Sequence, residues 1–429
     1  NLADKWGRKV KQLASCLHLK HDLNHYRTLA GGRDELEFIR ELPGGPYLWE
    51  MVCYHGRFGI HDTDYPDFTI FAETHGAERM FKLRADMMKY HGDLVSVYAN
   101  PFWWQADSQG VRALGGIENV AVRKRDGSLH DKFYSRNKHG YIVGAWRRPV
   151  IEQEVARLTS LRDRQGLDMV FQDTYGTRGE YEFAEDFHWP PYGYAQALID
   201  MARHSSAVLP VAGEGVGLDR TFRYLGATMG FYLTTMSGSR NRFYDNQHRA
   251  GTTRQWPIGA LILRDKIAVY PHNLAVSILT SENLSWALAA GMNMHYQTRR
   301  VLMDLEEGIG YDRLTALSYV QKTFCAPVFG ARVAAFGFLE QPFELTRTAY
   351  ANGFETYASH DDNPRTVSLH DRSVALAPHG FILFRGASPV AALLASDEHA
   401  GGVFHEWDRK AKDWTPVMPW KPTALTGVQ

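Results

Sequence analysis

Short apolar runs alternate with helix-like segments over roughly the first 320 residues of the chain. The runs that predict strands are 16–22, 47–54, 94–100, 169–173 and 208–214, with weaker candidates at 230–235, 258–263 and 292–297. The helical patterns between them include 78–90, 151–164, 192–204 and 283–290. About eight strands alternating with helices over about 300 residues predict an α/β fold, a (β/α)8 TIM barrel, which typically needs about 250 residues. An open doubly wound sheet is the main alternative.

The pattern changes after Cys325. Short segments rich in β-forming residues follow at 329–338, 343–352, 354–359, 365–369, 373–376 and 381–384. Turn signals such as Asn352-Gly353 separate them, which predicts a small antiparallel β-sandwich. We therefore expect a barrel at 1–325 and a C-terminal β domain at 326–429. An insertion at 105–146, after the third strand, is expected to shape one wall of the cleft.

Two carboxylates each close one of the apolar runs. Asp173 ends Leu-Asp-Met-Val-Phe-Gln-Asp, and Glu214 ends Val-Leu-Pro-Val-Ala-Gly-Glu. Parallel strands joined by a helix have their carboxyl ends on one side of the sheet, so both acids are expected at the same mouth. Two convergent carboxylates suit acid/base or nucleophilic work on a glycosidic bond. A purely structural interpretation makes Asp173 a helix cap and the glycines around Glu214 a turn.

A retaining glycosidase needs one ionised carboxylate as nucleophile and one protonated carboxyl that later acts as base. We favour Asp173 as nucleophile and Glu214 as acid/base, because Glu214 follows the more apolar run, an environment that favours the protonated acid. Retention requires the carboxyl groups to lie about 5–5.5 Å apart, and inversion about 6.5–9.5 Å.

Further candidates follow the ends of other predicted strands. Trp103 and Trp104 would form a stacking platform for a sugar if exposed, and are core residues if buried. The polar loop after the second strand is typical either of a binding loop or of a solvated one. The full set of candidate substrate-binding residues is Lys20, Asp22, His55, Arg57, Asp62, Tyr98, Asn100, Trp103, Trp104, Gln172, Tyr175 and His272.

Charge and composition exclude several classes of partner. The 48 basic and 48 acidic residues cancel, so neither nucleic acid nor a membrane surface is expected as a partner. No apolar stretch approaches the roughly 20 residues that span a bilayer. The chain starts at Asn1 without a signal peptide, which says little about its compartment. The localisation stays unknown; a soluble protein is expected, secreted or periplasmic if a signal has been removed. Aromatic residues make up 13%, which suits sugar binding and equally an ordinary core.

The cysteines and histidines give little support for a disulfide framework or a metal site. Cys16, Cys53 and Cys325 leave one cysteine unpaired and form no CxxC motif. His18 and His21 would share a face on a helix but point to opposite faces of the strand predicted here. HExxH and HxH motifs are absent, so we expect neither a metal nor any other cofactor. The absence of GxSxG and of a P-loop argues against serine esterases and nucleotide hydrolases.

The motifs Val-Phe-Gln-Asp173-Thr-Tyr-Gly and Ala-Gly-Glu214-Gly resemble the barrel of the endo-α-N-acetylgalactosaminidase family and its uncharacterised relatives. Trp146-Arg-Arg-Pro and Leu284-Ser-Trp-Ala-Leu-Ala-Ala-Gly291 are also similar. The resemblance implies a retaining α-glycosidase, with a nucleophilic Asp after the fourth strand and an acid/base Glu after the fifth. The sequence has no counterpart of the large N-terminal β domain usual in that family, and N-acetylgalactosamine is not carried over as the substrate.

The leading hypothesis is a retaining hydrolase of α-linked glycans that acts without a cofactor on an oligosaccharide, polysaccharide or glycoconjugate. The alternatives are an inverting glycosidase or transglycosylase with the same acids, a carbohydrate-binding barrel without catalysis, and a metal-dependent hydrolase. The sugar, the linkage, exo or endo action and the oligomeric state stay open.

Overall fold

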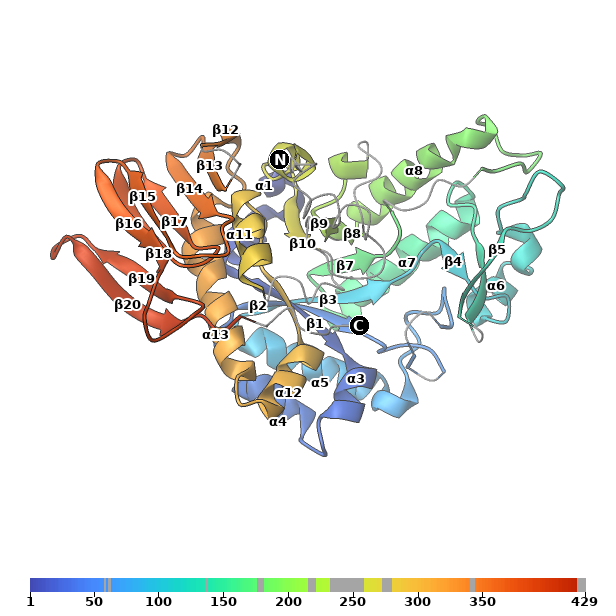
Figure 1. Ribbon diagram of the computed structural model, residues 1–429. Coiled ribbons are helices and arrows are strands. Elements are labelled where there is room, and N and C mark those ends of the chain that lie inside the picture. Colours follow the sequence, from blue (N-terminus) through green and yellow to red (C-terminus); the bar gives the residue numbers. More distant parts are fainter. Residues whose placement is uncertain are drawn as a thin grey trace.

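A parallel eight-stranded barrel forms the centre of the molecule (Figure 1). The structure is a computed structural model that describes residues 1–57, 59–60, 63–135, 138–175, 181–214, 221–231, 258–271, 280–339 and 344–422. The barrel strands are β1 (Leu17–Asp22), β2 (Tyr47–Val52), β3 (Leu94–Ala99), β7 (Met169–Gln172), β8 (Val211–Gly213), β9 (Ala227–Phe231), β10 (Ala268–Pro271) and β11 (His295–Gln297).

The ring of strands is closed by β11. This last strand pairs in parallel with β1, with His295 opposite His18. On the other side, the backbone N–H of Asn293 donates to the carbonyl oxygen of Val269 at 2.8 Å, which joins β10 to the chain entering β11. The TIM barrel predicted from the alternation of strands and helices is confirmed.

Helices follow most of the barrel strands. The α-helices outside the insertion are α1 (Leu2–Trp6), α2 (Val10–Ser15), α3 (Leu23–Leu29), α4 (Glu35–Glu41), α5 (Ala77–Tyr90), α7 (Arg148–Gln165), α8 (Tyr194–Ser206), α10 (Ile258–Leu263), α11 (Ser281–Ala289), α12 (Thr298–Glu306) and α13 (Gly310–Val320). Helix α7 shows how local sequence sets the limits. Pro149 lies in its first turn, where no intrahelical N–H is needed, and Gly166 ends it in the left-handed conformation at φ +67°.

One strand prediction is wrong. Residues 258–263, expected as a strand, form α10, and the strand in that part of the barrel is β10, ten residues further on. The six-residue run Ile-Gly-Ala-Leu-Ile-Leu is apolar throughout, so its periodicity does not separate a buried strand from a short helix. In the helix Ala260 is buried while Ile262 is largely exposed.

The chain between β3 and α7 builds a small sheet of its own, at the right of Figure 1. Its strands run in the order β4 (Trp103–Trp104), β6 (Lys138–Ile142) and β5 (Asp131–Ser135), all antiparallel. The short helix α6 (Gln109–Ala113) precedes β5. This part of the chain contains the predicted insertion at 105–146.

The C-terminal part is an antiparallel β-sandwich, at the left of Figure 1. Its nine strands are β12 (Val333–Phe338), β13 (Leu345–Tyr350), β14 (Phe354–Ser359), β15 (Arg365–Leu369), β16 (Arg372–Leu376), β17 (Phe381–Arg385), β18 (Ser388–Leu394), β19 (Val403–Asp408) and β20 (Asp413–Pro419). The first six correspond to the predicted segments, whereas β18, β19 and β20 were not foreseen.

Helix α11 joins the sandwich to the barrel. The hydroxyl of Ser285 donates to the carbonyl of Ser359 at 2.7 Å, and the hydroxyl of Thr348 donates to the carbonyl of Ala289 at 2.6 Å. The indole of Trp286 stacks on the imidazole of His360 with ring centroids 3.7 Å apart. One continuous apolar cluster includes residues of both parts, so the sandwich and the barrel share a core.

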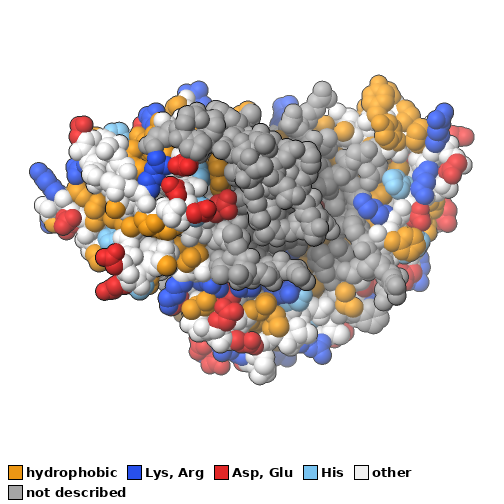
Figure 2. All heavy atoms as spheres, viewed as in Figure 1, with side chains coloured by type: hydrophobic (Ala, Val, Ile, Leu, Met, Phe, Trp, Pro, Cys, Tyr) orange, Lys and Arg blue, Asp and Glu red, His pale blue; other side chains and the backbone are white. Residues whose placement is uncertain are grey.

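All three cysteines, Cys16, Cys53 and Cys325, are buried and free. Acidic and basic side chains are interspersed over the described part of the face in Figure 2, as expected from their equal numbers. Within the described ranges, no helix has both the length and the apolar character required to cross a bilayer.

The shared core predicts coupled unfolding of the two parts. Trp286→Ala should lower the free energy of unfolding by about 3–5 kcal/mol, because it empties a buried aromatic position between them. Far-UV circular dichroism in guanidinium checks this and should give one transition in the native protein. Tyr90→Ala, at an exposed position of α5, is the control and should stay within about 0.5 kcal/mol. A native sandwich that unfolds separately from the barrel would contradict the shared core.

Candidate active site

The strand registers show which side chains face the barrel interior. Lys20 lies opposite Glu50, and Tyr98 lies opposite Phe171. Register partners on neighbouring parallel strands face the same side, and successive residues alternate. His18, which lies on the same face of β1 as Lys20, contacts Glu50 on β2 and the ring of Tyr270 on β10. Strands β1 and β10 are not neighbours in the sheet, so the face that carries these residues is the interior of the barrel.

Asp173 and Glu214 occupy equivalent positions on adjacent strands. Gln172 at the end of β7 is the register partner of Gly213 at the end of β8, so each acid is one residue further on. The ladder continues past both strands, since the N–H of Asp173 donates to the carbonyl of Ala99 at 2.9 Å and that of Glu214 to the carbonyl of Gln172 at 3.4 Å. Both acids are half-buried. Neighbouring strands lie about 4.8 Å apart, so the two carboxylates leave the sheet side by side.

The residues before the acids fix the direction in which the acids point. The side-chain amide of Gln172 donates to Glu154 on α7 and to Ser205 on α8, so it points outward to the helices. A side chain at Gly213 would likewise meet Leu225. Asp173 and Glu214, each one residue further along, therefore point to the inside of the barrel mouth.

Asp173 is oriented by a buried tyrosine. The hydroxyl of Tyr98 donates to Oδ2 of Asp173 at 2.5 Å, and its ring stacks on Phe171 at 5.5 Å. The ammonium nitrogen of Lys20 lies 5.7 Å from the centroid of the Tyr98 ring. A hydrogen bond to an ionised carboxylate is short and strong, and it holds the carboxylate in one orientation.

Beneath this layer lies a cluster of buried charged and polar groups, of which the sequence analysis named Lys20 as a site residue and missed Glu50 and His295. Oε2 of Glu50 lies 3.1 Å from Nε2 of His18, and Oε1 lies 4.0 Å from Nζ of Lys20. Nδ1 of His18 lies 2.6 Å from Nδ1 of His295. The contact between the two imidazoles requires a proton on Nδ1 of one ring and a lone pair on Nδ1 of the other. The available signal was a charged residue inside an apolar strand, as in Tyr-Leu-Trp-Glu-Met-Val.

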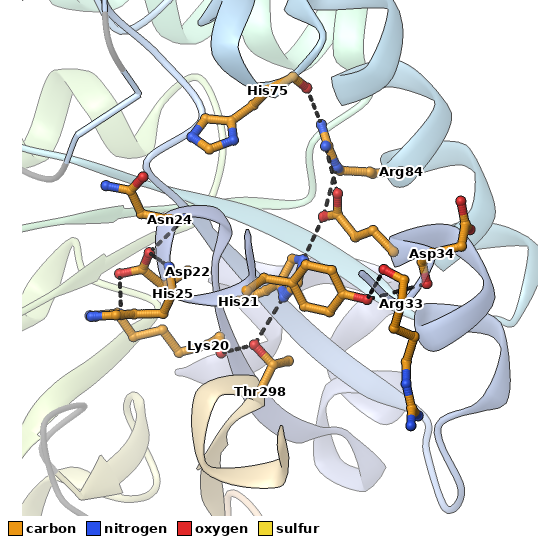
Figure 3. Close-up of polar contacts among 12 residues, drawn as sticks. Lys20, His21, Asp22, Asn24, His25, Arg33, Asp34, His75, Arg84 and Thr298 are labelled. Carbon is orange, nitrogen blue, oxygen red and sulfur yellow. Dashed lines mark hydrogen bonds and ion pairs between the residues drawn. The ribbon is translucent and has the colours of Figure 1, made fainter. Parts of the chain in front are cut away.

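The ends of β1 and the helices beside it hold a second polar network (Figure 3). The carboxylate of Asp22 accepts the backbone N–H groups of Asn24 and His25, and so caps α3. Burial alone would raise the pKa of Asp22, but the backbone N–H and the imidazole of His25 outweigh it and lower the pKa. The imidazole of His21 is bonded to Glu35 at 2.8 Å and to Thr298 at 2.9 Å. Asp22 therefore has the structural role of a cap in this structure.

The carboxylate of Glu35 joins this network to α5. Arg84 donates to both of its oxygens, at 2.8 and 2.6 Å (Figure 3). Burial alone would raise the pKa of Glu35, but the bonds from His21 and Arg84 lower it to about 2. Arg84 and Glu35 thus form an ion pair, to which His21 is hydrogen-bonded from the outer side of β1.

The other candidates lie partly at the mouth and partly away from it. His55 is buried and bonded to the carbonyl of Thr63 at 3.2 Å. Arg57 is exposed and bound to Asp64 and Asp107, in the loop beyond β2. Asn100 is the next residue after Tyr98 on the inward face. It is buried, and its side-chain oxygen accepts the N–H of Phe102 at 3.3 Å. Asp62 and His272 lie outside the described residues.

The expected stacking platform is not found at the two tryptophans. Trp103 and Trp104 are fully buried, and Nε1 of Trp103 donates to the carbonyl of Lys132 at 3.1 Å. Tyr175 is also fully buried, with its ring against Phe102 at 4.8 Å. These rings pack the base of the small sheet onto the barrel and are core residues. Among the described residues no group of three or more possible metal ligands is found.

Comparison with known proteins identifies the fold. Neither a protein-family model nor a curated protein matches the sequence. Among solved structures, the α-N-acetylgalactosaminidase NagBb from Bifidobacterium bifidum is similar with a TM-score of 0.63 at 15% identity, over 88% of this chain and 60% of that one. An α-amylase from Lactobacillus plantarum gives 0.54 at 11% identity, over 89% and 99%. Trehalose-6-phosphate hydrolase from Bacillus licheniformis gives 0.54 at 10%, over 86% and 98%.

At these identities the likeness establishes the fold. The chain shares the barrel fold of these proteins and spans about 60% of the length of NagBb.

Glu154, which anchors Gln172, gives a test of this local geometry. Burial raises its pKa from 4.5 to about 7, although Arg157 and the amide of Gln172 partly offset the effect. The folded state therefore binds the proton of Glu154 more tightly than the unfolded chain, so the contribution of Glu154 to stability is greatest below pH 4.5 and falls as the pH rises toward 7. The loss should reach about 3 kcal/mol, as 1.36 kcal/mol per pKa unit.

Glu154→Gln should remove this dependence and make the protein more stable than the native one at pH 8 but not at pH 4.5. Denaturant unfolding of both proteins between pH 4.5 and pH 8 measures this difference in stability. Glu152→Gln, an exposed position on the same helix, is the matched control and should leave the slope unchanged. A Glu154→Gln curve that stays parallel to the native curve would show that Glu154 does not titrate as described.

Proposed function

We propose that the chain is a glycoside hydrolase that cleaves an α-linked glycan with retention, with Asp173 as nucleophile and Glu214 as acid/base. The observation that carries the proposal is the register pairing of β7 with β8, which supports two inward carboxylates side by side at the barrel mouth. Adjacent strands about 4.8 Å apart favour the short separation of about 5–5.5 Å required for retention over the wider one for inversion. Residues 1–325 are proposed as the catalytic barrel and 326–429 as an accessory β domain.

The proposed reaction has two displacements. The Asp173 carboxylate attacks the anomeric carbon while Glu214 gives its proton to the departing glycosidic oxygen, which forms a covalent β-linked glycosyl ester. Glu214, now a carboxylate, takes a proton from water as that water attacks the same carbon, and Asp173 leaves as a carboxylate. The product is the α-anomer, and both acids return to their starting state.

The contacts of Asp173 support its role as nucleophile. The Tyr98 hydroxyl holds one carboxylate oxygen, Oδ2, through a charge-assisted hydrogen bond. A hydrogen bond donated to the charged carboxylate favours the ionised form that attack requires.

The substrate class follows from the fold and from the acids together. The similar structures carry names of α-glycosidases, an α-N-acetylgalactosaminidase and an α-amylase. These names make aryl α-N-acetylgalactosaminide and α-glucoside the first substrates to test, beside the matching β-glycosides.

Substitution of the two acids should separate their roles. Asp173→Ala and Glu214→Ala should each lower kcat by about 10³-fold or more on a cleaved aryl α-glycoside. Added azide should restore turnover in Glu214→Ala with an α-glycosyl azide as product, because azide replaces water in the second displacement. In Asp173→Ala azide should give the β-glycosyl azide, because it replaces the nucleophile. NMR of the products distinguishes the two anomers.

Glu152→Ala, an exposed acid on α7, is the control and should retain native activity. The native enzyme should release the α-anomer first. Release of the β-anomer first would make the enzyme inverting. Full activity in both acid variants would exclude these residues, and a panel without any turnover would favour a carbohydrate-binding protein.

A further inference from the structure

One face of the small sheet β4–β6–β5 carries a row of ring-bearing side chains. In this sheet Trp104 is the register partner of Tyr141, and His139 is the register partner of Phe133. Opposite residues of antiparallel strands share a face, as do alternate residues of one strand. Trp104, Tyr141, His139 and Phe133 therefore form one continuous row, here named the aromatic stripe.

The aromatic stripe runs from the protein core to the solvent. Trp104 is fully buried, Tyr141 is partly buried, the side chain of His139 is 40% exposed and Phe133 is 61% exposed. Its rings touch in sequence, with centroids 4.9 Å apart for Tyr141 and His139 and 4.2 Å for His139 and Phe133. The last two rings lie within 8° of parallel.

Polar groups border the exposed end of the aromatic stripe. Asp131 lies on the same face, with Oδ2 3.5 Å from Nε2 of His139 and Oδ1 2.8 Å from the ammonium of Lys124. Both are partly exposed. Flat apolar rings bordered by an acceptor and a cationic donor match a pyranose ring, which has apolar C–H faces and a rim of hydroxyl groups.

The base of the aromatic stripe is fixed to the end of the barrel that carries the two acids. Strand β4 starts four residues after β3 ends, and the N–H of Val143 donates to the carbonyl of Phe102 at 3.0 Å. The carboxylate of Glu182, from the chain between β7 and α8, accepts the N–H of Arg123 at 2.9 Å and Nε1 of Trp146 at 3.2 Å. Two connections that both leave the C-terminal end of the barrel thus brace the small sheet.

We infer that the aromatic stripe is a binding site for sugar residues of the glycan beyond the one that is cleaved, with a pyranose ring stacked on the outer face of Phe133, whose inner face is supported by His139. The inference rests on the proposed function for the class of ligand. It assigns to Phe133, held in place by His139, the sugar stacking that the buried Trp103 and Trp104 do not provide. Asp131 and Lys124 supply hydrogen bonds to the hydroxyl groups of the bound rings.

Electrophoresis in native gels that contain soluble starch or gastric mucin tests binding without requiring turnover. The native protein should be retarded in at least one of the two gels relative to a gel without polysaccharide. Phe133→Ala, and separately His139→Ala, should raise the apparent dissociation constant in that gel by about tenfold, the loss expected for one well-packed aromatic contact. Phe133→Trp should restore retardation, because it restores a stacking surface.

Tyr90→Ala is the matched control, because Tyr90 is an exposed aromatic residue at the end of α5. This variant should be retarded as the native protein is. Phe133 is an exposed residue, and circular dichroism of each variant checks that the fold is kept. Absence of retardation of the native protein in both gels, or equal retardation of Phe133→Ala, would overturn the inference. Retardation that depends on Phe133 without hydrolysis of any glycoside would support the aromatic stripe and contradict the proposed catalytic function.

Discussion

The pairing of Gln172 with Gly213 is the contact on which the candidate site depends. A slip of one residue in a strand moves every side chain to the opposite face, so it would turn Asp173 or Glu214 out of the mouth. The side chain of Gln172 opposes such a slip, because its amide is bound between Glu154 of α7 and Ser205 of α8. The helices outside the barrel thereby determine which residues face its interior, and the position of the acids is a property of packing on both sides of the sheet.

The interior of the barrel departs from the branched apolar filling that is usual for this fold. Glu50 is completely buried, and a buried carboxylate is stable only beside cationic or hydrogen-bonding partners. Lys20 and His18 are such partners, and the ring of Tyr98 lies near the same ammonium. Since Tyr98 also binds Asp173, buried groups from three neighbouring strands form a connected path from the centre of the barrel to the proposed nucleophile.

The sequence was informative where periodicity and strand ends decide the structure, and less so where packing decides. Six of the eight barrel strands lie within predicted runs, since apolar runs separated by helices have few other folds. The prediction 230–235 overlaps β9 only at residues 230–231, and 232–235 lie outside the described residues. The run 258–263 was misassigned because an apolar run of six residues fits a helix as well as a strand. Trp103 and Trp104 follow a strand end as binding residues often do, but only the tertiary fold shows that both rings are buried. Glu50 was overlooked because a charge inside a strand is informative only when its partners are known.

The structure separates the tasks of the barrel strands from those of the connections between them. Asp173 and Glu214 extend the hydrogen-bonded ladder directly, so their positions are as rigid as the strands. Phe133 and His139 lie on a sheet formed within a single connection, and they can change without altering that ladder. If both proposals hold, the cleavage reaction depends on the two acids at the strand ends. The length and type of glycan accepted then depend on the small sheet. The brace through Glu182 ties the small sheet to the chain that follows β7, and under the proposed function the distance between the sheet and the mouth would set which sugar along a glycan reaches the two acids.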